Sequence, residues 1–301
     1  MQKDDEMRVS QDVNDKAEAT NKKPSQSAEE IARDSMERYC GCSVEQFKDY
    51  LLLTNFPPYI ELFCKEHEGT TFEGTSFKVC HSSKSNISIL DFKMGSPMAA
   101  LVMDLCKYLP FKGLLMLGMA GGLRDRFSLG DFFVPVGSIR AEGTSDFYFP
   151  PQVPALGNFV MQRLMTETLE LYKIAYHLGI TYTTNRRFWE FNLQFREEMM
   201  KLRPHAIEME CATLFTAGNK HKIPIGALLL ISDLPLQEGG IKTKESAQFI
   251  FDKFMPQHID MGCEILAKLD KWQNCQGAQC CDLANFVTRD GPGALSHPQG
   301  K

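Results

Sequence analysis

The sequence predicts an α/β fold in which helices cover the faces of a central sheet, and three observations support this. Apolar segments of strand length alternate with amphipathic segments of a dozen or more residues. The run 225–231, Ile-Gly-Ala-Leu-Leu-Leu-Ile, is typical of a strand buried on both faces of a parallel sheet. Acidic residues follow apolar runs at Glu208, Glu210 and Asp233, and open α/β sheets bind ligands beyond their strand ends.

The first half of the chain already alternates in this way. Residues 43–64 have helical periodicity, which the prolines at 57 and 58 interrupt. A helix is expected over 95–109, because Pro97 falls in its first turn, where proline is tolerated. The strands that we expect are 87–92, 114–117 and 132–140, and the second should end in a glycine turn at 118–122.

The second half repeats the pattern. A long amphipathic segment predicts a helix over 157–177, and the last periodic segment predicts a helix over 244–270 that is broken near Pro256. Between them we expect strands at 180–184 and 225–231, and helices at 191–202 and 211–220.

Bulk composition limits the classes of protein. The 301 residues are 43% hydrophobic, enough for one large domain or two small ones, and carry a net charge of −5. Mild acidity without a long basic stripe argues against a nucleic-acid partner. No apolar run approaches the roughly 20 residues that span a bilayer, so we expect no membrane partner. Residues 1–35 and 273–301 hold few large apolar side chains, which predicts disordered tails around one domain at 36–272.

The ten cysteines show no paired C-x-x-C spacing, and the histidines do not cluster near them. We therefore expect neither a metal nor another cofactor. The N-terminal residues contain no apolar signal region, so a reduced, cytoplasmic protein is expected.

Two glycine motifs follow predicted strands, Gly95-Ser96-Pro97 and the turn that contains Gly121 and Gly122. Glycine there allows backbone amides to approach a ligand, and a helix that starts after the turn favours anions. Tight packing explains most such glycines equally well. Neither motif matches a P-loop or a dinucleotide fingerprint.

Two further segments combine cations with hydroxyl groups. Arg140, Thr144 and Ser145 end a predicted strand and are candidates to bind a phosphate or a ribose, although Arg140 could simply pair with Glu142. The loop 183–190 combines aromatic, amide and guanidinium groups, a mixture that suits a purine ring plus a phosphate. Its candidate residues are Asn185, Arg186, Arg187, Phe188 and Trp189. The alternative is a helix start whose aromatic side chains pack in the core.

The acidic motifs also have two interpretations. Glu208, Met209, Glu210, Ser232 and Asp233 could meet in one crevice and act on a polar substrate. Alternatively, the glutamates open a helix and interact with its dipole, while Ser232 and Asp233 cap the next helix. Spacing alone does not separate these interpretations.

Taken in order, these motifs resemble the purine nucleoside phosphorylase and nucleosidase superfamily, and most closely its short-form AMP nucleosidases. The resemblance runs from about Glu37 to Leu269 and implies a three-layer fold with a central mixed sheet between helices. The motifs that carry it are Gly95-Ser96-Pro97, Gly121-Gly122-Leu123, Leu129-Gly130-Asp131, Arg140 to Ser145, Thr184 to Glu190, Glu208-Met209-Glu210, Ser232-Asp233-Leu234-Pro235 and Lys242-Thr243.

The resemblance implies hydrolysis of the N-glycosidic bond of AMP, with water, to adenine and ribose 5-phosphate. Asp233 would protonate the leaving base, and Glu210 with Met209 would hold a ribose that becomes cationic. Phe188 and Trp189 would line the base pocket, while Gly95, Gly121 and Gly122 would border the anomeric carbon. Arg140, Thr144, Ser145, Arg186 and Arg187 would be the candidates for the phosphate.

Alternatives stay open at this point. Met119-Ala120 replaces the polar residues usual in this turn of the short-form enzymes, which argues against an anion there. A phosphorylase or nucleosidase acting on unphosphorylated nucleosides is the second interpretation, with phosphate as ligand or effector. A catalytically silent nucleotide-binding protein is the third. The resemblance also implies a homo-oligomer, a hexamer.

Overall fold

The computed structural model describes residues 26–275, and the remainder of both predicted tails lies outside these residues. One mixed sheet of ten strands forms the centre, with the order β10-β6-β8-β9-β5-β1-β4-β3-β2 and with β7 paired to β6. The strands are β1 (Tyr50–Thr54), β2 (Thr70–Glu73), β3 (Lys78–His81), β4 (Ile87–Asp91), β5 (Gly113–Gly122), β6 (Phe132–Ala141), β7 (Ala155–Leu156), β8 (Tyr176–Thr184), β9 (Ala206–Glu208) and β10 (Ile225–Asp233).

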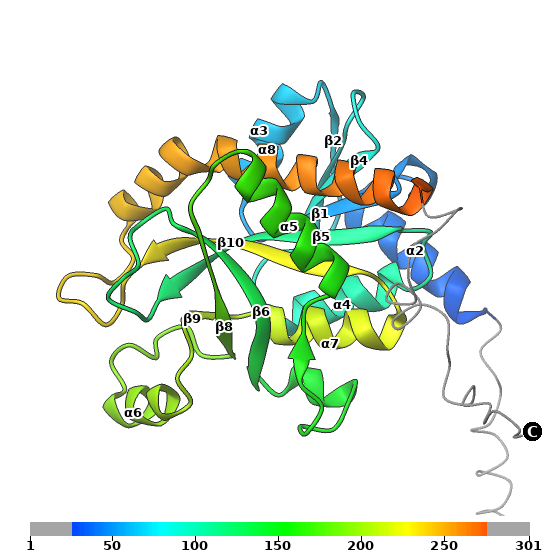
Figure 1. The fold of residues 1–301 in the computed structure, drawn as a ribbon. Helices are drawn as coiled ribbons and strands as arrows, with labels where there is room; N and C mark the ends of the chain where they lie inside the picture. The colour runs from blue at the N-terminus through cyan, green and yellow to red at the C-terminus, as the bar shows by residue number, and fades with distance from the viewer. Residues whose placement is uncertain (1–25, 276–301) are drawn as a thin grey trace, which may run out of the picture.

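Helices cover both faces of this sheet, which confirms the three-layer fold (Figure 1). The first face carries α2 (Ala28–Cys40), α4 (Ser96–Cys106) and α7 (Cys211–His221), and the second carries α3 (Pro57–Glu66), α5 (Phe159–Leu171) and α8 (Lys244–Cys275). The short α6 (Leu193–Lys201) and the 3₁₀ turns η1 (Val44–Gln46) and η2 (Thr144–Phe147) lie in connections. Among these described helices, none is both long and apolar enough to cross a bilayer.

Side-chain alternation along the central strands produces the two cores. In β1, Leu51 and Leu53 pack into the core under α4 and α7, while Tyr50 and Leu52 pack into the core under α3 and α8. All five residues of β1 are buried. The strand therefore has no polar face, as expected for a strand covered on both sides.

Five strands pair in a closed ring. β10 pairs with both β5 and β6, β6 with β8, β8 with β9, and β9 with β5. β4, β1, β5 and β10 run parallel to one another in the central part of the sheet. Their carboxyl ends therefore point in one direction, toward the mouth of the ring.

Several predicted elements are wrong in their type or their limits. The segment 43–64 is not one interrupted helix, since β1 occupies 50–54, and a fully buried apolar run has no period that separates strand from helix. The expected glycine turn 118–122 is part of β5, whose ten residues are all buried. At Gly122 a Cβ would lie 2.9 Å from both Leu234 and Phe127, so close packing explains this glycine.

Other limits also differ. The predicted helix 157–177 ends at Leu171, and β8 begins at Tyr176. Helix α8 continues through Pro256 without the expected break. The predicted N-terminal tail reaches too far, because a capping box at Ser27 and Glu30 starts α2 at Ala28. At the other end, α8 continues to Cys275, past the predicted start of the C-terminal tail at 273.

Truncation of Leu52 tests the strand assignment of β1. The Leu52 side chain is fully buried and lies so close to α8 that a Cβ at Gly262 would be 3.2 Å from its Cδ2. Leu52→Ala should lower the free energy of unfolding by about 2–5 kcal/mol, because it leaves a cavity between sheet and helix. Denaturant titration measures this, with Leu202→Ala, at a site that is 57% exposed, as the control. Equal losses in both variants would contradict the strand assignment.

Candidate active site

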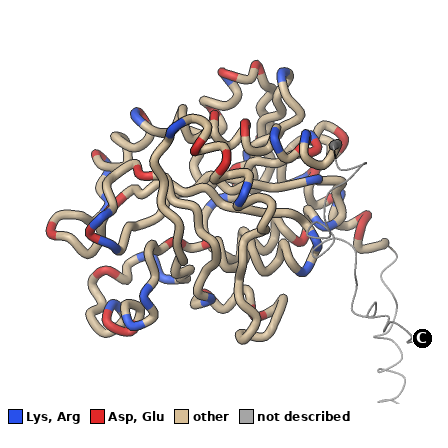
Figure 2. Tube along the Cα trace, viewed as in Figure 1, with Lys and Arg blue, Asp and Glu red and all other residues tan. Residues whose placement is uncertain are grey.

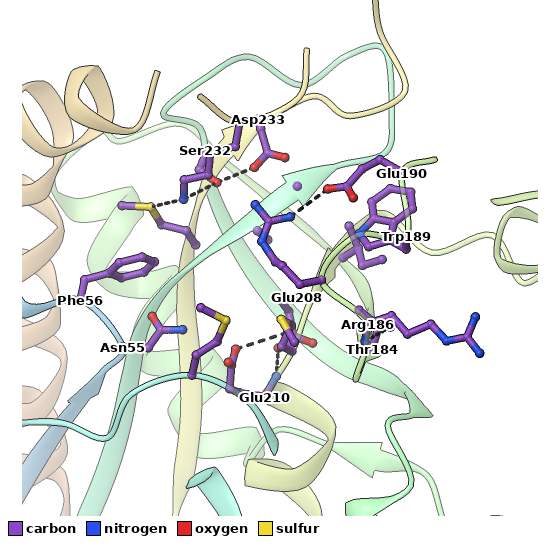
Figure 3. Close-up of a pocket in the computed structure, with 18 residues that line it drawn as sticks. Asn55, Phe56, Thr184, Arg186, Trp189, Glu190, Glu208, Glu210, Ser232 and Asp233 are labelled. Atoms are coloured by element: carbon purple, nitrogen blue, oxygen red, sulfur yellow. Dashed lines mark hydrogen bonds and ion pairs between the residues drawn. The ribbon is translucent and has the colours of Figure 1, made fainter. Parts of the chain in front are cut away.

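A cavity of about 270 Å³ opens at the carboxyl ends of the central strands (Figure 3). Asn55 follows β1, Gly121 lies near the end of β5, and Thr184, Glu208 and Asp233 end β8, β9 and β10. The ring of strands thus delivers polar side chains from separated parts of the sequence into one place. The lining residues are Asn55, Phe56, Met94, Met119, Ala120, Gly121, Thr184, Arg186, Arg187, Trp189, Glu190, Ile207, Glu208, Met209, Glu210, Ser232, Asp233 and Lys242.

Glu208 is buried and holds the start of helix α7. Its Oε2 accepts hydrogen bonds from the backbone N–H groups of Glu210 at 2.6 Å and Cys211 at 2.7 Å, and its Oε1 accepts one from Thr183 Oγ1. These are donors that a helix N-terminus leaves free. Burial raises the pKa of Glu208, whereas these hydrogen bonds lower it. Glu208 is therefore a positioning residue for the segment that carries Glu210.

Glu210 joins this turn to the turn after β4. Its Oε1 accepts a hydrogen bond from the N–H of Gly95 at 2.7 Å, while Ser96 Oγ donates to the carbonyl of Met209 at 2.6 Å. Gly95 has φ +96°, a conformation that favours glycine. Burial and the neighbouring Glu208 raise the pKa of Glu210 to about 8.

Asn55 adds an acceptor beside Glu210. Its amide lies close enough to lower the pKa of the Glu210 carboxyl group. Its Oδ1 is buried and has no hydrogen-bond partner within residues 26–275. A buried oxygen without a donor is unfavourable, so this atom is suited to accept a hydrogen bond from a ligand.

Asp233 lies at the opposite wall, where β10 ends (Figure 3). Burial raises its pKa, and the Ser232 hydroxyl, which donates to Asp233 Oδ1 at 2.7 Å, opposes that shift. Lys242 Nζ lies 3.3 Å from Ser232 Oγ and 5.2 Å from the centre of the Phe56 ring. Burial lowers the pKa of Lys242. A carboxyl group with a raised pKa keeps its proton to a higher pH, which suits a general acid.

The segment after β8 forms the third wall. Trp189 and Glu190 are buried and line the cavity, and Arg187 Nη1 lies 2.9 Å from Glu190 Oε1. Phe188 is 80% exposed and does not line the cavity, so its predicted place in the base pocket is not supported. Asn185 is exposed and donates to the carbonyl of Glu142 instead. Arg186 contributes to the lining, but its guanidinium group points away from the other labelled side chains in Figure 3.

The structure removes Arg140 from the candidate phosphate ligands. All five of its N–H groups donate within its own loop: to Ser145 Oγ, to Asp146 Oδ1, and to the carbonyls of Phe149, Pro150 and Val153. Its side chain is 5% exposed. Thr144 and Ser145 belong to the same loop and do not line the cavity. The strand-end arginine is therefore structural, although its carboxylate partner is Asp146 rather than the Glu142 that sequence suggested.

Of the three candidate glycines, only Gly121 lines the cavity. Gly95 is outside the lining and donates its N–H to Glu210, and Gly122 packs against the core. Sequence reasoning missed several lining residues, among them Asn55, Glu190 and Lys242. Asn55 could have been found as the polar residue after the apolar run 50–54, once that run is taken as a strand. Lys242 lies in a loop, so no strand end marks it, although Lys242-Thr243 is one of the motifs that carry the family resemblance.

Comparison with known proteins gives the class to which this fold and site belong. The family model described as "Phosphorylase superfamily" matches residues 44–269, and the chain belongs to this superfamily. The crystal structure of AMP nucleosidase from Bacteroides thetaiotaomicron VPI-5482 is similar at 32% identity and a TM-score of 0.73, covering 82% of this chain and 100% of that one.

Two curated relatives are more distant. AMP nucleosidase of Escherichia coli (strain K12) is 25% identical over 272 residues, which cover 75% of this chain and 56% of that protein. The chain thus spans about half the length of that relative. Uridine phosphorylase of Thermococcus kodakarensis is 23% identical over 216 residues, covering 66% of this chain and 77% of that protein. The expected resemblance to the superfamily and to AMP nucleosidases is confirmed.

The raised pKa of Glu210 predicts a pH-dependent stability difference. A carboxyl group whose pKa is higher in the folded than in the unfolded state lowers stability as pH rises from the unfolded value toward the folded one, about 8 here. Glu210→Gln removes this effect. The difference in unfolding free energy, variant minus parent, should therefore rise by at least about 1 kcal/mol from pH 5 to pH 8.5.

Denaturant titrations at the two pH values measure that difference. Glu197→Gln, at an exposed position of α6, is the matched control and should show no such change. If the gain of Glu210→Gln over the parent is the same at both pH values, Glu210 does not have the raised pKa that we assign to it.

Proposed function

We propose that the chain hydrolyses the N-glycosidic bond of a purine nucleoside 5′-monophosphate, AMP, to adenine and ribose 5-phosphate. The observation that carries the proposal is that Asp233, at the end of β10, and Glu210, at the start of α7, line one cavity. Breaking this bond builds positive charge on the ribose and negative charge on the departing base. The cavity has one buried acid for the base, Asp233, and another for the ribose, Glu210.

Asp233 serves the base. Its raised pKa keeps a proton available, and that proton moves to the imidazole-side nitrogen of the purine as the bond to the sugar breaks. Ser232 orients the carboxyl group through its hydrogen bond to Oδ1. Lys242, next to Ser232, favours the carboxylate that remains after the proton has left.

Glu210 serves the sugar. The Gly95 N–H and the Glu208-capped turn hold its carboxyl group in place, and its remaining acceptor capacity suits the ribose hydroxyls together with Asn55 Oδ1. Positive charge on the ribose lowers the pKa of Glu210, because an opposite charge nearby favours the ionised form. The attraction between the Glu210 carboxylate and the sugar therefore increases as positive charge develops there, which stabilises the transition state more than the bound substrate.

Water, rather than phosphate, is the proposed acceptor of the ribosyl group. Met94, Met119 and Ala120 contribute thioether and methyl groups to the cavity wall, which suit a phosphate dianion poorly. Arg187 and Lys242 lie near the acids Glu190 and Asp233 instead. For the 5′-phosphate of AMP, Arg186 in the cavity lining is the remaining candidate. Charged residues of both signs are interspersed along the described chain (Figure 2).

Product identification tests the reaction. The protein should release adenine and ribose 5-phosphate from AMP, with a rate that added inorganic phosphate does not raise. Adenosine and uridine, with and without phosphate, are the comparison substrates, because phosphorylases are among the relatives. Ribose 1-phosphate formed only with added phosphate would show phosphorolysis and overturn the proposal. The homohexamer and the cytoplasmic location stay predictions.

Replacement of Asp233 tests its role as the acid. Asp233→Asn keeps the shape of the side chain but cannot deliver the proton, so kcat/KM for AMP should fall by about 10²–10⁴-fold. The exposed Asp125→Asn is the matched control and should retain full activity. Turnover of Asp233→Asn within about tenfold of the parent would mean that another group protonates the base.

A further inference from the structure

One oxygen in the cavity wall lacks a partner and has no role in the mechanism above. Glu190 is 6% exposed, and its Oε2 has no hydrogen-bond partner within residues 26–275. Four side-chain atoms of the described chain share this property, the others being Thr54 Oγ1, Asn55 Oδ1 and Glu142 Oε2. Of the two carboxylates among them, Glu190 is the one that lines the cavity.

A buried carboxylate oxygen without a donor is costly, whereas one that receives an N–H from a ligand is stabilised. Arg187 Nη1 donates to the other oxygen, Oε1, at 2.9 Å, so the two side chains form a guanidinium–carboxylate ion pair. Oε2 is then an acceptor with no hydrogen to donate. The ligand group that fits it must be an N–H or O–H donor.

Glu190 lies at the base end of the cavity. It follows the buried Trp189 and lies on the same side of the cavity as Asp233, away from Glu210 (Figure 3). Asp233 is the group proposed to meet the imidazole-side nitrogen of the purine. On that edge of a purine, the substituent at position 6 is the next polar group: an amine donor in adenine, but an oxygen acceptor in 6-oxopurines.

We propose that Glu190 selects the base, with its free Oε2 accepting a hydrogen bond from the 6-amino group of a 6-aminopurine. A 6-oxopurine would place its oxygen against this carboxylate, so that both acceptors stay unpaired and repel each other. The inference rests on the proposed function in one respect, namely that the cavity holds a purine next to Asp233. Arg187 is a positioning residue in this arrangement, since it orients Glu190.

Binding of free bases tests the selection without any need for turnover. Titration calorimetry on the full chain would compare adenine, unsubstituted purine and hypoxanthine. Adenine should bind at least about tenfold more tightly than purine and about 100-fold more tightly than hypoxanthine, because a site built around one hydrogen bond rejects analogues that cannot make it.

Glu190→Gln is the central variant. Its amide can turn either an oxygen or an N–H toward the base, so the preference for adenine over hypoxanthine should fall below about tenfold. Glu142→Gln is the matched control, since Glu142 also has a buried Oε2 without a partner in the described chain but does not line the cavity. It should leave the preference unchanged. Thermal unfolding of both variants verifies that they fold.

The outcomes separate this inference from the proposed function. Equal affinity for adenine and hypoxanthine, tighter binding of hypoxanthine, no measurable binding of any base, or an unchanged preference in a folded Glu190→Gln would each overturn the role of Glu190. Selective adenine binding that Glu190→Gln abolishes supports it, even if AMP is not hydrolysed. Conversely, equal hydrolysis of AMP and IMP would support the proposed hydrolysis but contradict the selection of the base by Glu190.

Discussion

The cavity depends on the hydrogen bonds that Glu208 makes to the start of helix α7. Two backbone N–H groups and the Thr183 hydroxyl converge on this buried carboxyl group, tying β8, β9 and α7 together. One of these N–H groups belongs to Glu210, so the hydrogen bond fixes the backbone of Glu210 and thereby the direction of its side chain. The N–H of Gly95, in the turn after β4, donates a hydrogen bond to the Glu210 carboxyl group. Two acidic residues in one short segment therefore divide the work: Glu208 positions the turn, and Glu210 faces the ligand.

Closure of the five strands into a ring explains how the remaining groups reach the same place. In an open sheet of this strand order, β6, β8 and β9 would separate β10 from β5, whereas here β10 pairs with both β5 and β6, and β9 links β8 to β5. Thr184, Glu208 and Asp233 therefore surround one mouth. The three walls carry different chemistry: Glu210 and Asp233 are buried acids with raised pKa values on two of them, and Glu190 is a paired, buried carboxylate on the third.

Sequence alone could predict the layers of the fold and the acidic centre of the site. The run 225–231 was recognisable because a strand covered on both faces has no polar side. The same property made the prediction at 50–54 wrong. This apolar run lies next to a helix and has no polar positions of its own, so it was included in the helical periodicity of 43–64. The contacts of Arg140 could not be predicted, because its acceptors are mostly backbone carbonyls of an irregular loop. Lys242 approaches Ser232 only through tertiary folding.

Ring closure also has a consequence for how substrate preference can diverge in proteins of this shape. Each strand of the ring is paired on both sides, so a shift of one backbone segment would strain its two neighbours and then the whole circuit. The residues just beyond the strands, such as Asn55 and the segment 185–190, escape that restraint. Diversification of ligand choice should concentrate in those connecting positions, and attempts to redesign the protein for another nucleotide would begin there.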